Sequence, residues 1–241
     1  MAPPFGAGRV QSVKVLLLNG NTTRAVTDRM VAAVRQDCLP DVQIVGVTAA
    51  FGEPYVASRA AAAVATHAAL DAVRTEVAQG QQAGEAPSDV CFYACFGEPG
   101  IDAIRAEMPF PVVGMAEGAI LTALQMGERF SILTVGEAWP GMLRDHLRRL
   151  DLMGRCAGIG VVPGAALSLA GDRAEGARAV LEAATRALEA QAPDVLIVAG
   201  AALAGYGRDL AGRLPVPVVD SLFAGFEQSL ALGRLARGMR G

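Results

Sequence analysis

Asp89-Val90-Cys91-Phe92-Tyr93-Ala94 and Asp194-Val195-Leu196-Ile197-Val198-Ala199 follow one pattern, in which an aspartate precedes a continuous apolar run that ends in a turn of small residues. A short apolar run of this kind is typical of a strand in a parallel sheet, which is buried on both faces. Pro111-Val112-Val113 and Pro217-Val218-Val219 repeat in the same order behind the two runs. The repetition predicts two similar lobes, although a single doubly wound sheet is the alternative, because any two strand–helix units share this pattern.

Strands and helices alternate along the whole chain, which predicts an α/β fold with parallel sheets. Further strands are expected at residues 13–18, 42–47, 111–115, 130–135, 159–162 and 216–219. Helices are expected from the turn at 19–23 to residue 35, and at 57–74, 139–150, 173–191 and 222–235. We assign residues 13–116 and 217–237 to the first lobe, residues 117–216 to the second lobe, and residues 1–12 to a flexible N-terminus.

The composition is that of a globular protein, because 52% of the 241 residues are hydrophobic and 19% are charged. The net charge of −3 comes from interspersed residues of both signs without a basic stripe, so we expect no nucleic-acid partner. The N-terminal residues lack the apolar run of a signal peptide, and apolar stretches such as 195–204 are too short to span a membrane. We therefore expect a cytoplasmic protein with no membrane partner.

Neither a metal nor an organic cofactor is expected. The four cysteines form no C-x-x-C pair, and only two histidines accompany them, so we expect no zinc or iron–sulfur site. In a reducing compartment the cysteines are expected to be free thiols. The phosphate-binding patterns G-x-x-x-x-G-K-[ST] and G-x-G-x-x-G do not follow the first strand.

The carboxyl ends of parallel strands are where ligands bind in α/β sheets, and this rule brings together the turns at Asn19, Cys95, Thr134 and Ala201. Cys95 is the sharpest candidate, because turn amides and the positive end of a helix stabilise a thiolate at such a position. The alternative is that this cysteine is a small buried apolar residue. Structural roles are expected for the other three cysteines, Cys38, Cys91 and Cys156.

Polar residues elsewhere are weaker candidates. The turn Asn19-Gly20-Asn21-Thr22-Thr23 offers amides, hydroxyls and backbone N–H groups that suit a carboxylate or a ring imide, or it is an ordinary helix-capping turn. Thr134 closes a strand, where it either binds a ligand or caps the next turn. Glu117 is expected to cap a helix, and His146 with the arginines around it is typical of a solvated helix face.

Four segments resemble a known family in the order in which they occur. The turn at 19–23 resembles the N-P-N-T-S turn of hydantoin and allantoin racemases, and Ala94-Cys95-Phe96-Gly97-Glu98-Pro99-Gly100 closely resembles their A-C-F-G-D-P-G segment. Pro111-Val112-Val113-Gly114-Met115-Ala116-Glu117 resembles P-V-I-G-I-A-E, and Pro217-Val218-Val219-Asp220 resembles a late P-V-I-D. By these segments the chain is similar to the Asp/Glu/hydantoin racemase superfamily.

The resemblance implies two pseudo-symmetric Rossmann-like (flavodoxin-like) lobes with an active-site cleft between them, in a homo-oligomer. It implies an isomerase that needs no cofactor and moves a proton at a carbon α to a carbonyl of a small molecule: a hydantoin, allantoin or an amino-acid derivative. Two cysteines would face opposite sides of that carbon, because inversion needs a base on one face and an acid on the other. The residues implied to bind substrate are Asn19, Asn21, Thr22, Phe96, Gly97, Thr134 and Ala202.

One position departs from the family's pattern. The family's second cysteine lies in a G-C-A-G segment, and the matching residues here are Gly200-Ala201-Ala202-Leu203, so Ala201 occupies the position of the second thiol. Three hypotheses stay open. The chain is a racemase, in which Tyr206 or a water serves the second face; a lyase resembling arylmalonate decarboxylase, with one-sided protonation by Cys95; or a catalytically silent protein that binds a small carboxylate or ureide.

Overall fold

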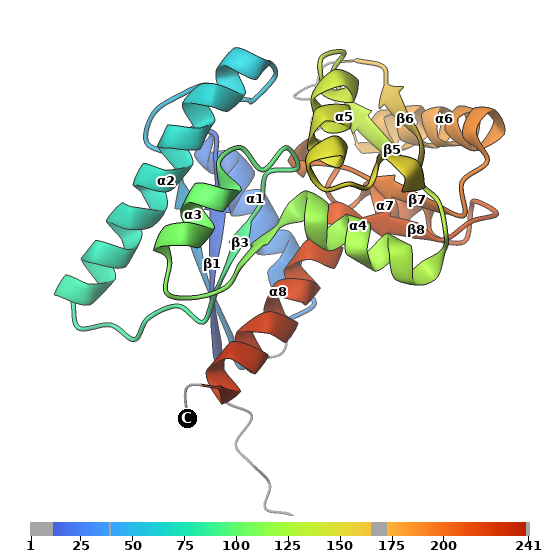
Figure 1. The fold of residues 1–241 in the computed structure, drawn as a ribbon. Coiled ribbons are helices and arrows are strands. Elements are labelled where there is room, and N and C mark those ends of the chain that lie inside the picture. The colour runs from blue at the N-terminus through green and yellow to red at the C-terminus, as the bar shows by residue number, and fades with distance from the viewer. Residues whose placement is uncertain (1–11, 39, 165–172, 240–241) are drawn as a thin grey trace, which may run out of the picture.

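The computed structural model describes residues 12–38, 40–164 and 173–239. The flexible N-terminus expected at residues 1–12 lies, apart from Ser12, outside the described residues. The described chain forms two four-stranded parallel sheets, each flanked by helices (Figure 1). The expected α/β fold with two lobes is confirmed, and the alternative of a single doubly wound sheet is wrong.

The first sheet has the strand order β2-β1-β3-β4 and comprises β1 (Val13–Asn19), β2 (Val42–Thr48), β3 (Val90–Tyr93) and β4 (Val112–Gly114). Helix α1 (Arg24–Arg35) covers one face, and α2 (Arg59–Gln82) and α3 (Ile101–Glu107) cover the other. Val15 and Leu17 pack toward α1, whereas Leu16 and Leu18 pack toward α2 and α3. Burial on both faces explains why this strand has a continuous apolar run rather than an alternating one.

The second sheet repeats this arrangement. Its order is β6-β5-β7-β8, and it comprises β5 (Phe130–Val135), β6 (Cys156–Val162), β7 (Val195–Val198) and β8 (Val218–Asp220). One face is covered by α4 (Met115–Met126) and α5 (Trp139–Arg149), and the other by α6 (Arg173–Gln191) and α7 (Tyr206–Leu210). The identical strand order makes the two lobes pseudo-symmetric.

Helices α4 and α8 (Ser221–Gly238) are exchanged between the lobes. Helix α4 follows the last strand of the first sheet but packs on β7 of the second, whereas α8 follows β8 and packs on β1 and β3 of the first (Figure 1). The assignment of 217–237 to the first lobe is therefore wrong for β8, because this strand pairs with β7. Parallel pairing of Leu196 with Val218 fixes β8 in the second sheet, and only the helix behind it returns to the first lobe.

Some elements differ from expectation in length or were not expected. Helix α2 continues past residue 74 to Gln82 and ends where Gly84 has a φ of 68°, a left-handed conformation that suits glycine after a helix. Strand β6 begins at Cys156 rather than at residue 159. Sequence periodicity did not predict α7 or the two short 3₁₀ helices, Met153–Arg155 and Ala201–Leu203, because each is too short to show a period.

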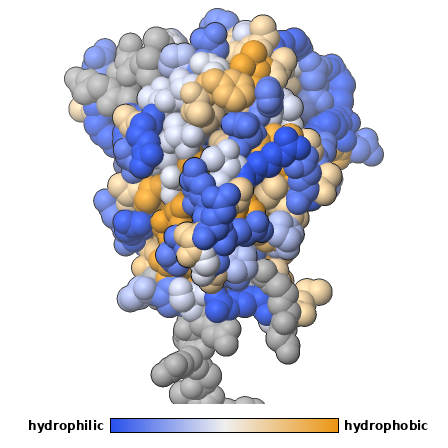
Figure 2. All heavy atoms as spheres, turned by 90° about the vertical axis from the view of Figure 1, so that its left-hand side faces the viewer, coloured by the Kyte–Doolittle hydropathy of each residue, from blue (hydrophilic) through white to orange (hydrophobic). Residues whose placement is uncertain are grey.

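The face of the molecule that carries α2 is mostly hydrophilic, with apolar residues in separate patches between polar ones (Figure 2). Within the three described ranges, no helix combines the length and the apolar character that a membrane crossing requires.

The crossing of α4 and α8 yields a prediction about stability. A Cβ atom at Gly118 would lie 2.7 Å from the Gly225 Cα, closer than packed atoms come. Gly118→Ala should therefore lower the free energy of unfolding by about 1–3 kcal/mol, as overpacking of a core does.

Gly80→Ala is the matched control, since Gly80 is also helical but a Cβ atom added there would meet no neighbouring residue within 4 Å. This control should stabilise the chain by up to about 1 kcal/mol. Urea unfolding measures both variants, and equal effects would contradict the crossing.

Candidate active site

A cavity of about 40 Å³ lies between the lobes, at the carboxyl ends of strands from both sheets. Its walls are formed by first-lobe residues and, from the second lobe, by the end of β5, Trp139 of α5 and the segment after β7. The lining residues are Asn21, Tyr55, Val56, Ala94, Cys95, Phe96, Thr134, Val135, Trp139, Ala199, Gly200, Ala201 and Ala202. The expectation that Cys95, Thr134 and Ala201 meet at the carboxyl ends of the strands is therefore confirmed.

Cys95 sits in a tight turn just beyond β3. The Ala94 N–H donates to the Leu18 carbonyl at 2.8 Å, which extends the strand, and the Glu98 N–H donates to the Cys95 carbonyl at 3.0 Å, which closes the turn. Burial raises the pKa of the Cys95 thiol to about 11, although hydrogen bonds from the backbone amides of Gly97 and Glu98 lower it. The two amides act in the expected direction, but burial outweighs them, so the thiol form is favoured at neutral pH.

Glu98 joins the cysteine turn to the start of α4. Its side chain is fully buried, and Oε1 accepts hydrogen bonds from the N–H groups of Ala116 at 2.6 Å and Glu117 at 2.9 Å. This is a helix cap supplied from another loop, because the N-cap residue of α4 is Gly114, which has no side chain. Burial raises the pKa of Glu98 to about 8, against the effect of the two amides, so the carboxyl group holds a proton through much of the neutral range.

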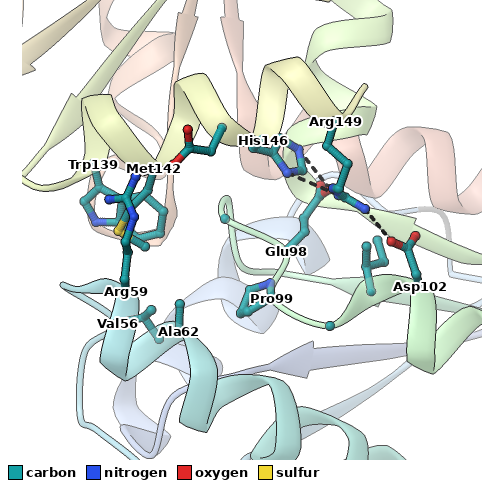
Figure 3. Close-up of a pocket in the computed structure, with 14 residues that line it drawn as sticks. Val56, Arg59, Ala62, Glu98, Pro99, Asp102, Trp139, Met142, His146 and Arg149 are labelled. Atoms are coloured by element: carbon teal, nitrogen blue, oxygen red, sulfur yellow. Dashed lines mark hydrogen bonds and ion pairs between the residues drawn. The ribbon is translucent and has the colours of Figure 1, made fainter. Parts of the chain in front are cut away.

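His146 lies at the lobe interface, so the expectation of a solvated helix face is wrong for this residue. Only 8% of it is exposed, and its Nε2 atom is 3.4 Å from Glu98 Oε2 (Figure 3). Burial, and after it the charge of Arg149, lower the pKa of His146 to about 4, so the imidazole is neutral at physiological pH. His146 shares one side of α5 with Leu143 and Leu147, which are also buried, so the helical spacing was a signal that could have marked it.

Two ion pairs flank the Glu98–His146 contact and also tie α5 to the first lobe. Arg59 at the start of α2 pairs with Asp145, and Asp102 of α3 pairs with Arg149. Beside them lies a larger pocket of about 380 Å³ (Figure 3). Its lining residues are Val56, Arg59, Ala62, Gly97, Glu98, Pro99, Gly100, Ile101, Asp102, Trp139, Met142, Asp145, His146 and Arg149.

Trp139 separates this pocket from the Cys95 cavity. Its ring packs so closely on Gly97 that a Cβ atom there would lie 2.7 Å from the indole. Trp139 and Val56 line both spaces. We take the smaller cavity as the candidate active site, because it holds the thiol and the ends of strands from both lobes, whereas the larger pocket lies on the outer side of the cysteine turn.

The loop after β7 is held like the cysteine turn, by a buried carboxyl group. Asp220 Oδ2 accepts from the N–H groups of Gly205 at 2.7 Å and Gly207 at 3.2 Å, while Oδ1 accepts from Leu222 N–H at 3.1 Å and caps α8. The Gly200 N–H donates to Ser221 Oγ at 3.0 Å. Ala201 therefore presents only a methyl group to the cavity, from a well-anchored segment.

Six of the nine sequence-predicted site residues line the cavity: Cys95, Ala201, Asn21, Phe96, Thr134 and Ala202. Asn19 does not, because its buried amide organises the turn by donating to Asn21 Oδ1 at 3.1 Å and Thr27 Oγ1 at 3.0 Å. Thr22 is also outside the lining, and its N–H donates to the Glu53 carbonyl at 3.2 Å. Gly97 lines the neighbouring pocket and contributes only its amide to Cys95.

Tyrosines show where sequence reasoning failed. Tyr206, suggested for the second face, is buried in the second-lobe core with its ring 4.5 Å from the Arg173 guanidinium carbon, and it does not line the cavity. Tyr55 lines the cavity instead. The loop after β2 that carries it has no periodic pattern, so nothing in the sequence marked this residue.

Known proteins share this fold. The profile of the Asp/Glu/Hydantoin racemase family matches residues 15–228, so the chain belongs to that family. Hydantoin racemase from Pseudomonas sp. (strain NS671) is 29% identical over 213 residues, which are 88% of this chain and 83% of that protein. The crystal structure of allantoin racemase from Pseudomonas fluorescens is 28% identical and has a TM-score of 0.83 over 92% of each chain. Arylmalonate decarboxylase shares the fold, with a TM-score of 0.61 and 16% identity over 92% of each chain.

The charge of Glu98 yields a prediction about the reactivity of Cys95. Glu98 is ionised wherever Cys95 titrates, because its own pKa is about 8, and its charge raises the pKa of the thiol. Glu98→Gln keeps an acceptor for the two α4 amides but removes the charge. The pH midpoint for alkylation of Cys95 by iodoacetamide should therefore move to lower pH, as measured by peptide mapping.

Asp102→Asn is the control for this experiment. Asp102 lies in the neighbouring pocket and pairs with Arg149, and it is not among the groups that shift the pKa of Cys95. Its removal should leave the alkylation midpoint unchanged. A midpoint that stays the same in Glu98→Gln would show that Glu98 does not act on the thiol.

Proposed function

We propose that the chain racemises a small ureide, such as a 5-substituted hydantoin or allantoin, by proton transfer at the carbon α to a carbonyl, with Cys95 as one acid–base group. The observation that carries the proposal is the half-buried Cys95 at the end of β3, in a cavity between two lobes of the racemase fold. The names of the relatives, hydantoin racemase and allantoin racemase, support this substrate class. No cofactor is needed for this chemistry.

Proton abstraction leaves negative charge on the substrate's carbonyl oxygen, and polar groups of the cavity can hold it. The Oδ1 atom of Asn21 accepts hydrogen bonds from Asn19 Nδ2 and from the Thr23 N–H group. Within the described ranges the Asn21 Nδ2 group donates no hydrogen bond, so it is available to a substrate oxygen. Thr134 lies across the cavity at the end of β5. We assign to these two side chains the binding of the ureide carbonyl groups.

The cavity admits a ureide ring only after movement. Its volume of about 40 Å³ is room for about three water molecules, whereas a hydantoin ring with its two oxygens has seven non-hydrogen atoms. Trp139 is the side chain that separates the cavity from the larger pocket. We expect the ring to enter as Trp139 moves, and the substituent on the reacting carbon to extend toward that pocket.

A second candidate is one-sided protonation after decarboxylation. The raised pKa of Cys95, about 11, keeps the thiol protonated at neutral pH, which suits an acid that delivers a proton to a carbanion. In this reaction the bond to a carboxylate breaks, carbon dioxide leaves, and the Cys95 proton forms the new C–H bond. Arylmalonate decarboxylase has the same fold, although 16% identity supports the fold alone.

A substrate panel with two variants tests these candidates. With hydantoins, allantoin, amino acids and arylmalonates in deuterated water with EDTA, we expect the unaltered chain to exchange the α-proton of a ureide and to racemise it weakly. Cys95→Ala should abolish both, whereas Ala201→Cys should raise racemisation, because it places a second thiol at the position of the family's second cysteine.

Cys38→Ala is the control, because Cys38 lies outside the cavity lining. It should behave like the unaltered chain. Loss of carbon dioxide from an arylmalonate without ureide exchange would favour the lyase, and binding without any reaction would favour the silent binding protein. Activity that survives Cys95→Ala would refute the assigned role of the thiol in either reaction.

A further inference from the structure

We propose that the hydroxyl group of Tyr55 is the acid–base group on the face of the substrate opposite Cys95, in place of the thiol that Ala201 lacks. The inference rests on the proposed racemisation and deepens it by naming the second proton carrier. Tyr55 stands in the loop between β2 and α2, and no motif in the sequence points to it.

Tyr55 and Cys95 both line the cavity but pack against different cores. Cys95 packs against the first-lobe core that contains Leu18 and Tyr93. Tyr55 comes from the first lobe but packs against the second-lobe core, the one that Ala202 also contacts. We infer that the phenol approaches a bound substrate from the side of the second lobe, whereas the thiol approaches it from the side of the first lobe.

The turn at 19–23 positions Tyr55. The Thr22 N–H donates to the Glu53 carbonyl at 3.2 Å, and Thr23 Oγ1 donates to the Pro54 carbonyl at 2.7 Å, so the two residues before Tyr55 are both tied to this turn. Asn19 holds the turn itself through its buried amide. This gives Asn19 and Thr22 a function, although neither lines the cavity: they present the loop that carries the phenol.

Among the lining residues, only Cys95 and Tyr55 titrate in a range that suits proton transfer. Ordinary pKa values are about 8.5 for cysteine and about 10 for tyrosine, whereas hydroxyl, amide and indole groups such as those of Thr134, Asn21 and Trp139 do not ionise in this range. Burial raises the pKa of Tyr55 and outweighs a hydrogen bond with Trp139 that lowers it, and a charge on Cys95 also raises it. When Cys95 is a thiolate, Tyr55 thus keeps its proton, which is the combination of base and acid that inversion requires.

The reaction balances with these two groups. The Cα–H bond breaks as the Cys95 thiolate takes the proton, and the electron pair moves onto the carbonyl oxygen. This electron pair then forms a new C–H bond on the other face of the carbon with the proton of Tyr55. The O–H bond of Tyr55 breaks and leaves a phenolate. Water returns a proton to the phenolate and removes one from the thiol. From the other enantiomer, the phenolate takes the proton and the Cys95 thiol gives one.

Tyr55→Phe separates inversion from exchange. With a single enantiomer of the best ureide in deuterated water, the variant should lose inversion by at least about 10²-fold, the lower range for an acid–base group. It should still exchange the α-proton for deuterium with retention of configuration, because Cys95 can return a proton to the face from which it took one. Ala201→Cys in the Tyr55→Phe background should restore inversion, which also shows that the variant folds and binds substrate.

Tyr206→Phe is the matched control, since it makes the same chemical change at a tyrosine outside the cavity. It should racemise like the unaltered chain. Unchanged inversion in Tyr55→Phe would overturn the role of Tyr55, as would exchange without inversion by the unaltered chain. Loss of both exchange and inversion without rescue by Ala201→Cys would show a structural role and overturn it too. Absence of exchange by the unaltered chain on every substrate would overturn the racemase function itself, and this inference with it.

Discussion

The crossing of α4 and α8 is the contact on which the geometry of the site depends. Each helix leaves the last strand of one sheet and packs on the other sheet, and the two meet where Gly118 faces the backbone at Gly225. Since packed interiors do not absorb even one added methyl group freely, this approach fixes the distance between the lobes. The reciprocal exchange makes the carboxyl ends of β3 and β7 face each other, so that two short apolar runs far apart in the sequence end on one cavity.

Glu98 and His146 are buried beside each other between the lobes, and the burial of each makes the stability of the chain depend on pH. Burial raises the pKa of Glu98 from 4.5 to about 8, so its contribution to stability is complete below pH 4.5 and is lost as the pH rises toward 8. Burial lowers the pKa of His146 from 6.5 to about 4, so its contribution is complete above pH 6.5 and is lost as the pH falls toward 4. Near neutral pH a protonated carboxyl group thus faces a neutral imidazole, and α5 is held beside the cysteine turn without a buried net charge.

The sequence predicted those parts of the molecule that depend on local patterning. Apolar runs marked most of the strands, and their ends placed Cys95, Thr134 and Ala201 in one cavity because parallel strands end at one edge. The sequence did not predict the contacts between these helices and strands. The lobe that β8 joins is decided by pairing with β7, and the burial of His146 by what packs against α5. Tyr55 belongs to an irregular loop, and its position follows from hydrogen bonds to a turn about thirty residues away rather than from any period.

Alanine at position 201 is compatible with racemisation because inversion depends on the protonation state of a pair and not on its chemical identity. One group must be deprotonated while the group on the opposite face holds a proton. Two thiols meet this requirement, and so do a thiol and a phenol that share a small cavity, since a charge on either raises the pKa of the other. If Tyr55 acts as proposed, racemisation by this chain depends on the turn at Asn19, which holds the tyrosine loop in place, rather than on the residue at position 201.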